Sequence, residues 1–209
     1  MLAPAQPAYA EPPPPPAPAG EAGPSGPGSR KGDVLVGMAW DIALPVGSVH
    51  DFISDTSVAG FEISLRYFVI PKLSIGVSTD WQSFSEDRPR TTFQLENGAL
   101  TATAYNSIWG GTLRGLVHFY PLEKGPVLPF IGGNIGVGWS TLQTSAADLV
   151  IYDNQTSVAL GGDLGALIQP NRHSPTFLVA ARYSAQPAAE FLSVTDVQSV
   201  TFQFGLMMR

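Results

Sequence analysis

The feature that most constrains this chain is an alternation of apolar with small or polar residues that repeats from Asp33 onward. In the stretch 59–69, odd positions hold Ala, Phe, Ile, Leu, Tyr and Val, and even positions hold Gly, Glu, Ser, Arg and Phe. A helix would mix these two sets around its circumference, whereas a strand places them on opposite faces. The alternation therefore predicts β-strands that have one strongly apolar face.

Stretches of this kind recur along the chain, each roughly ten residues long, which is the length a tilted strand needs to cross a bilayer. They lie at 34–42, 59–69, 73–82, 109–119, 131–139, 158–168, 176–183 and 199–206. An even number of strands lets an up-and-down barrel close with both chain ends on one side. We therefore predict an all-β fold, an eight-stranded antiparallel up-and-down barrel.

The less apolar face of these stretches distinguishes a soluble barrel from a transmembrane one. It consists of Gly, Ser, Ala and Thr with isolated acids and arginines, and it has almost no Lys. A soluble barrel such as a lipocalin keeps its large apolar residues inside and its charges outside. A face this small and sparsely charged fits the lumen of a transmembrane barrel better. A soluble lipocalin-like barrel that binds a small apolar ligand is the alternative, and the direction of the tryptophan-bearing face separates the two.

Composition narrows the function classes. Charged residues make up 13% of the chain, about half the share of a soluble domain. No stretch approaches the roughly 20 apolar residues that a spanning helix needs. The absence of Cys excludes disulfides, thiolate metal sites and Cys nucleophiles. A net charge of -6 argues against a nucleic-acid partner.

The connections alternate in length, as short periplasmic turns and long external loops do in outer-membrane barrels. Short connections are expected at 70–72, 121–127 and 170–175, and long loops at 45–57, 85–106, 140–156 and 184–193. The short connections carry the basic residues Lys72, Lys124 and Arg172. The long ones carry the acids Asp51, Asp55, Glu86, Asp87, Asp148 and Asp153.

This orientation predicts two sets of side chains. Aromatic girdles at the two membrane interfaces would consist of Trp40, Trp81, Trp109 and Trp139 near the long loops, and Tyr67, Phe119 and Phe177 near the short turns.

A narrow lumen tolerates charges only when they are paired. We expect a polar network that plugs it, formed by Asp41, Glu62, Arg66, Asp80, Arg114, His118, Asp163 and Arg182. A hairpin centred in the turn 170–175 places Asp163 opposite Arg182. A gated, narrow ion pathway is the alternative interpretation of these charges.

The first 32 residues differ from the rest. They are rich in Pro, Ala and Gly, include the run Pro12–Pro16, and show no apolar period. We expect a disordered, extended leader at 1–32 and the barrel at 33–209. Ala8-Tyr9-Ala10 matches a signal-peptidase site, without the basic and apolar regions that normally precede one. A truncated signal and a chance match both remain open.

With these residues identified, the chain resembles the small eight-stranded outer-membrane barrels, the OmpA-like transmembrane domains and their relatives, over about residues 33–209. The matching segments are WDIALPVG (Trp40–Gly47), SVAGFEISLRYFV, LSIGVSTDW and PFIGGNIGVGW (Pro129–Trp139). The resemblance implies a monomer in the outer membrane of a Gram-negative bacterium, in contact with outer-membrane lipid and lipopolysaccharide, with a structural, surface-interaction or minor-channel role. Long loops would bind any surface ligand. Such proteins often end on an aromatic residue, whereas this chain continues from Phe204 to Arg209.

Enzymes also exist on eight-stranded outer-membrane barrels, and the esterases among them place a His beside a Ser, with an acid. His173 and Ser174 are adjacent in the sequence, but neighbours on an extended chain point apart. His50, His118 and His173 are too scattered for a metal site. We therefore expect no catalytic, cofactor or metal site.

Overall fold

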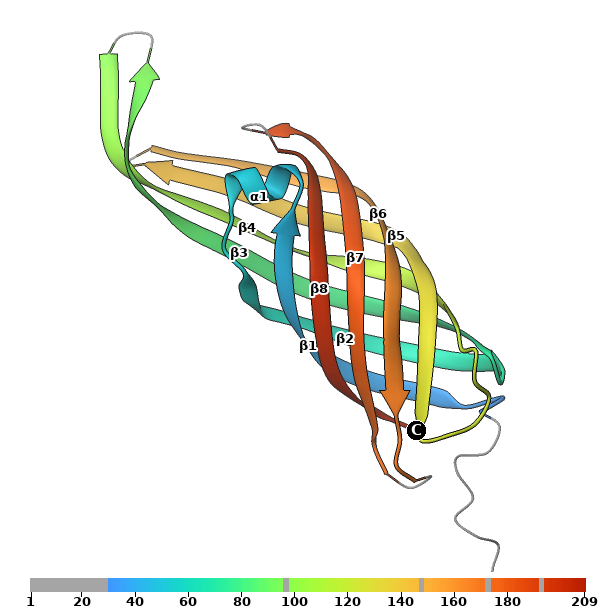
Figure 1. Ribbon diagram of the computed structural model, residues 1–209. Coiled ribbons are helices and arrows are strands. Elements are labelled where there is room, and N and C mark those ends of the chain that lie inside the picture. Colours follow the sequence, from blue (N-terminus) through green and yellow to red (C-terminus); the bar gives the residue numbers. More distant parts are fainter. Residues whose placement is uncertain (1–29, 96–97, 147–148, 172–173, 192–193) are drawn as a thin grey trace, which may run out of the picture.

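The computed structural model describes residues 30–95, 98–146, 149–171, 174–191 and 194–209. It is one antiparallel sheet closed into a barrel (Figure 1). Its elements are β1 (Val34–Val46), α1 (Ser48–Phe52), β2 (Ser57–Ile70), β3 (Leu73–Leu95), β4 (Gly98–Phe119), β5 (Val127–Ala146), β6 (Leu149–Ile168), β7 (Thr176–Phe191) and β8 (Val194–Met208). The leader expected at 1–32 lies almost entirely outside the described residues.

Closure of the ring confirms the predicted topology. Each strand pairs with the next one in the sequence, and β1 pairs with β8, so that Val36 faces Met208 and Val46 faces Gln198. No sheet edge is left within the ring, which is a condition for placing a sheet in lipid. Among the described residues, no helix has the length and apolar character needed to cross a membrane.

The alternation in the sequence produces two faces of opposite character. Large apolar side chains such as Met38, Ile135 and Leu164 point outward and are about 60% exposed (63%, 61% and 63%). The side chains between them point into the barrel, where charged and hydroxyl groups are buried. The ring is narrow, so a polar lumen and an apolar exterior follow directly from the period of two.

The short connections are confirmed at 71–72, 120–126 and 169–175, although Arg172 and His173 lie outside the described residues. Neighbouring turns are joined by main-chain hydrogen bonds, from Tyr120 N to Lys72 O (2.8 Å) and from Gln169 N to Pro126 O (2.7 Å). The C-terminus lies at this end of the barrel (Figure 1). We call it the turn rim, and the opposite end the hairpin rim.

Three of the four expected long loops are instead paired strands, and the strands are correspondingly longer than predicted. The β3–β4 ladder continues to Leu95 opposite Gly98, and the β5–β6 ladder to Ala146 opposite Leu149. β7 likewise extends through the segment expected as a loop at 184–193. Apolar alternation is required only where one face meets lipid, whereas main-chain pairing continues in water without it. The expectation of loops at 85–106, 140–156 and 184–193 was therefore wrong. Asp148, one of the acids expected in these loops, lies outside the described residues.

Parts of β3 to β6 extend past the closed ring (Figure 1). β3 loses its pairing with β2 after Trp81, and β6 gains its pairing with β7 only from Leu160. Between them, β4 and β5 stay paired as far as Ala104 opposite Ala146. We call residues 82–95, 98–110, 140–146 and 149–159 the protruding sheet.

The fourth connection, 47–56, folds back over the mouth of the barrel. Val49 and Phe52 of α1 are buried there. The Ser48 hydroxyl donates to Asp196 Oδ1 (2.6 Å), and Arg88 Nη2 donates to the carbonyls of Asp51 (2.6 Å) and Phe52 (2.9 Å). Hydrogen bonds thus join the helix to both β8 and the protruding sheet, and the helix covers the hairpin rim.

Candidate functional site: the lumen of the barrel

An apolar cluster of buried residues lies at each end of the lumen. At the turn rim, the turn cluster consists of Leu35, Ala39, Phe68, Tyr120, Leu128, Phe130, Leu167, Leu178, Ala180 and Met207. At the hairpin rim, the hairpin cluster consists of Ala43, Val49, Phe52, Ile53, Phe84, Ile108, Leu142, Val194 and Val197. At the turn end, the Arg30 guanidinium also lies 5.6 Å from the centre of the Phe68 ring and donates to Gln169 Oε1 (2.7 Å).

Between the clusters, Arg182 of β7 is the centre of an ion-pair network. Its Nε lies 2.5 Å from Asp163 Oδ1, its Nη1 contacts Glu62 Oε2, and the same nitrogen lies 3.8 Å from Asp80 Oδ2. These partners come from β6, β2 and β3. One guanidinium, 2% exposed, therefore connects four strands of the barrel.

Asp163 sits directly opposite Arg182 in the β6–β7 ladder, which is the register predicted from the turn. Its other oxygen accepts from Asn134 Nδ2 (3.0 Å) and lies 3.1 Å from His118 Nε2. Together with the contact from Arg182, these hydrogen bonds compensate a carboxylate removed from water. His118 and Asn134 extend the network to β4 and β5.

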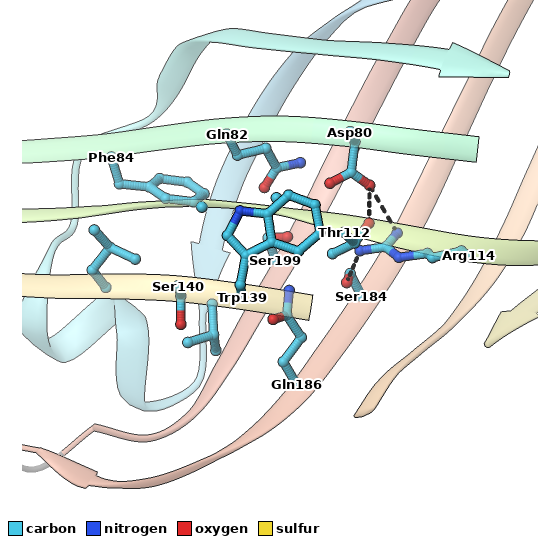
Figure 2. A pocket seen from close by; sticks show the side chains of 14 residues that line it. Asp80, Gln82, Phe84, Thr112, Arg114, Trp139, Ser140, Ser184, Gln186 and Ser199 are labelled. Carbon is cyan, nitrogen blue, oxygen red and sulfur yellow. Dashed lines mark hydrogen bonds and ion pairs between the residues drawn. The ribbon is translucent and has the colours of Figure 1, made fainter. Parts of the chain in front are cut away.

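A second branch leads toward the hairpin rim (Figure 2). Asp80 Oδ2 accepts from Thr112 Oγ1 (2.7 Å) and lies 3.3 Å from Arg114 Nη1, and Arg114 Nη2 donates to Ser184 Oγ (2.8 Å). These groups border a cavity of about 30 Å³ that is otherwise lined largely by Gln, Ser and Gly, with Phe84 of the hairpin cluster among its walls. The cavity has room for about one or two water molecules.

Two of the predicted lumen residues lie apart from the ion pairs. Arg66 is 1% exposed, and its guanidinium stacks 5.0 Å from the centre of the Phe130 ring. Asp41 connects to Glu62 through Gln203, whose Nε2 donates to Asp41 Oδ1 and Glu62 Oε2 at 3.2 Å each. Of the remaining six, Glu62, Asp80, Arg114, Asp163 and Arg182 are joined by ion pairs, and His118 joins them through its contact with Asp163.

Sequence reasoning missed the uncharged members of the network. Thr112, Asn134, Ser184 and Gln203 hold the carboxylates and guanidiniums in place. The available signal was their position on the inward face of the strands, because any inward polar group in a narrow lumen needs a partner. A selection of charged residues alone therefore leaves out the uncharged members of the network.

The predicted girdle residues lie on the outer face of the barrel. Trp40, Trp109 and Trp139 are 51%, 40% and 38% exposed, and Trp81 is half-buried because it stacks on Trp109 at 5.5 Å. Near the turn rim, the exposed rings are Tyr67, Phe119 and Phe177. The tryptophan-bearing face thus points out of the barrel, which is the opposite of the lipocalin arrangement.

We predict that these tryptophans lie at one membrane interface. In vesicles containing brominated lipids, bromine near the headgroups should quench their fluorescence more strongly than bromine at the chain ends, because indole prefers the interface. Iodide in the aqueous phase should have little access to Trp109 and Trp139 when these are the single remaining tryptophans. Free access of iodide combined with no quenching by lipid bromine would contradict the membrane orientation.

The described residues contain no group of three or more His, Asp or Glu side chains that could hold a metal ion. Ser174 donates to Asn171 Oδ1 (2.5 Å) at the turn rim. Its sequence neighbour His173 lies outside the described residues, and His118 is buried against Asp163 inside the lumen.

No protein-family model matches the chain, and no curated protein sequence matches it significantly. Solved structures do match. Neisserial surface protein A (NspA) is 16% identical, with a TM-score of 0.54, over 84% of this chain and 96% of its own. Ail of Yersinia pestis also matches, with 16% identity and a TM-score of 0.48 over 85% of this chain and 99% of its own. OprG of Pseudomonas aeruginosa matches with 18% identity and a TM-score of 0.46 over 87% of this chain and 98% of its own. At this identity the likeness to NspA concerns the fold. Together with the apolar exterior and the closed ring, it makes the chain an eight-stranded transmembrane β-barrel with the fold of the small bacterial outer-membrane proteins.

Proposed function

We propose that this protein is a non-enzymatic outer-membrane barrel of a Gram-negative bacterium that acts through its outer surface. The ring anchors it in lipid as a monomer, and the protruding sheet carries its contacts outside the cell. The observation that supports this best is the combination of a buried apolar cluster at each end of the lumen with strands that continue well beyond the ring.

The closed lumen favours an anchor over an open pore. A permeating ion would have to pass the turn cluster, the ion pairs of Arg182 and the hairpin cluster in turn. Each apolar cluster excludes water, and each buried ion pair is costly to separate without a replacement partner. Opening such a path requires displacement of α1, which is held by Ser48 and Arg88.

The protruding sheet favours a surface role. Near the tip of β6, Val150 and Tyr152 are 53% and 67% exposed. Ring closure ends at Leu160, and unpaired strand edges are not tolerated in hydrocarbon, so these side chains lie above the lipid core. Apolar side chains gathered in water commonly mark a contact surface. Lipopolysaccharide headgroups and a surface ligand are the expected neighbours of this sheet.

The placement of the two rims can be tested with single cysteines, because the chain has none of its own. We expect a membrane-impermeant maleimide to label Tyr152→Cys on intact cells. The control Glu123→Cys, in an exposed turn at the opposite rim, should be labelled only after the membrane is permeabilised. Labelling of Glu123→Cys alone on intact cells would reverse the proposed orientation.

Planar-bilayer recordings separate the anchor from a minor channel. The purified wild-type chain is expected to give no steady conductance at neutral pH. Phe52→Ser, which removes an aromatic ring from the hairpin cluster, should raise the frequency of brief openings, because water gains access to the cavity beneath it. Tyr105→Ser, on an exposed side chain of β4, is the control and should change nothing. A steady current through the wild-type barrel would establish the channel role instead.

A further inference from the structure

We infer that the lumen binds one small monovalent cation, a proton or a sodium ion, between the carboxylates of Asp41 and Glu62. The inference rests on the closed lumen of the proposed function. It goes beyond that function because it assigns a ligand to the interior of the barrel.

The first argument is the balance of buried charge. The lumen holds four buried carboxylates, those of Asp41, Glu62, Asp80 and Asp163. Against them stand three buried guanidiniums, those of Arg66, Arg114 and Arg182; the buried Arg30 and Asp33 at the turn rim carry opposite charges and cancel in the count. With His118 neutral, one negative charge is left over. The closing clusters keep out bulk water, so ions in solution cannot screen that charge as they would at a surface.

The excess charge is concentrated at Asp41. Asp80, Asp163 and Glu62 each have an arginine within ion-pair distance. Within the described part of the chain, no basic group forms an ion pair with Asp41. Its carboxylate, 1% exposed, accepts there only from the neutral amide of Gln203. The arginine that completes the charge count, Arg66, stacks on Phe130 instead.

The second argument is a set of three oxygens without partners. Gln203 Nε2 donates to both carboxylates and so holds Asp41 and Glu62 next to each other. The other oxygens of these three side chains, Asp41 Oδ2, Glu62 Oε1 and Gln203 Oε1, are buried and accept no hydrogen bond in the described structure. Carboxylate and amide oxygens are the ligands of hard cations, and two adjacent carboxylates also favour a shared proton.

Charged and titratable groups on the surrounding strands define the field at this position. They are Glu62 on β2, Asp80 on β3, Arg114 and His118 on β4, Asp163 on β6 and Arg182 on β7. All three acids in this set, Glu62, Asp80 and Asp163, already have an arginine within ion-pair distance. A further positive charge is therefore favoured beside Asp41 and disfavoured beside Arg182.

The test is urea unfolding of the full chain in lipid vesicles, for the wild type and Asp41→Asn. One series varies pH at fixed sodium. The other replaces sodium with choline at constant ionic strength and fixed pH. If a proton is taken up on folding, the folded state binds more protons than the unfolded state. Stability is then greatest at low pH, and the folding equilibrium constant falls by up to tenfold per pH unit as pH rises. If sodium is taken up, the constant instead rises by up to tenfold for each tenfold increase in sodium.

Asp41→Asn should abolish whichever dependence the wild type shows, because the amide replaces the carboxylate that no arginine pairs with and so removes the cation site. The matched control Asp163→Asn changes a carboxylate that already has Arg182 and His118. It should lose stability at every pH and keep the wild-type dependence. The inference is overturned if wild type and Asp41→Asn respond alike to both pH and sodium, or if the wild type responds to neither. Conductance reports on the closed lumen separately, so a leaky barrel would be recognised as a failure of the proposed function.

Discussion

Arg182→Met is expected to lower the free energy of unfolding by about 3–5 kcal/mol, the cost of leaving buried charge without its partner. Methionine retains most of the volume of the side chain, so the loss reports on charge rather than on packing. Arg182 contacts three carboxylates, and its removal leaves Glu62 and Asp163 without their arginine and Asp80 with Arg114 alone. Urea unfolding from lipid vesicles measures the effect.

Arg114→Met is the matched control. Arg114 has one ion pair, with Asp80, so its substitution should lower the free energy of unfolding by less than Arg182→Met does. From the hairpin register alone, the loss of Asp163 by itself is expected to destabilise much more than the joint loss of Asp163 and Arg182, with Arg114 and Glu62 as the other partners at hand. The structure changes that expectation, because the double variant Asp163→Asn with Arg182→Met still leaves Glu62 and Asp80 without the contact from Arg182. Full recovery in that double variant, or a loss below about 1 kcal/mol for Arg182→Met, would show that Arg182 is not the centre of the network.

Gly136→Ala is expected to be the most disruptive small change in the barrel wall. Gly136 points into the lumen from β5, and a Cβ at this position would overlap the carbonyl oxygen of Leu113 and press on the Cα of Arg114. Backbone atoms cannot move aside as a flexible side chain does, so β4 and β5 must separate. We expect a loss of about 1–3 kcal/mol and a reduced yield of folded protein in lipid vesicles.

Gly133→Ala on the same strand is the control. Gly133 points outward, and a Cβ there would meet its nearest neighbour, Gly161 O, at 3.7 Å, an ordinary contact. It should fold like the wild type and gain slightly from lower chain entropy in the unfolded state. Equal losses in the two variants would mean that glycine is needed in β5 for a reason other than the narrow lumen.

The sequence by itself determined the strands, their two faces and their order around the ring. Each of these depends on a local signal. The period of two in segments such as 59–69 is imposed by lipid on one side and a narrow lumen on the other. A short turn also fixes the register of its own hairpin, which is why the position of the turn 170–175 is enough to place Asp163 opposite Arg182.

Only the tertiary structure decided where the strands end and which charges meet across the lumen. Above the lipid the alternation is no longer required, so the ladders of β3 to β6 continue without a signal in the sequence. Contacts such as Arg182 with Glu62, or Gln203 with Asp41, join strands that are not consecutive in the sequence. Their alignment depends on the stagger of the whole ring, which is a property of the closed barrel and is not specified by any single strand or turn.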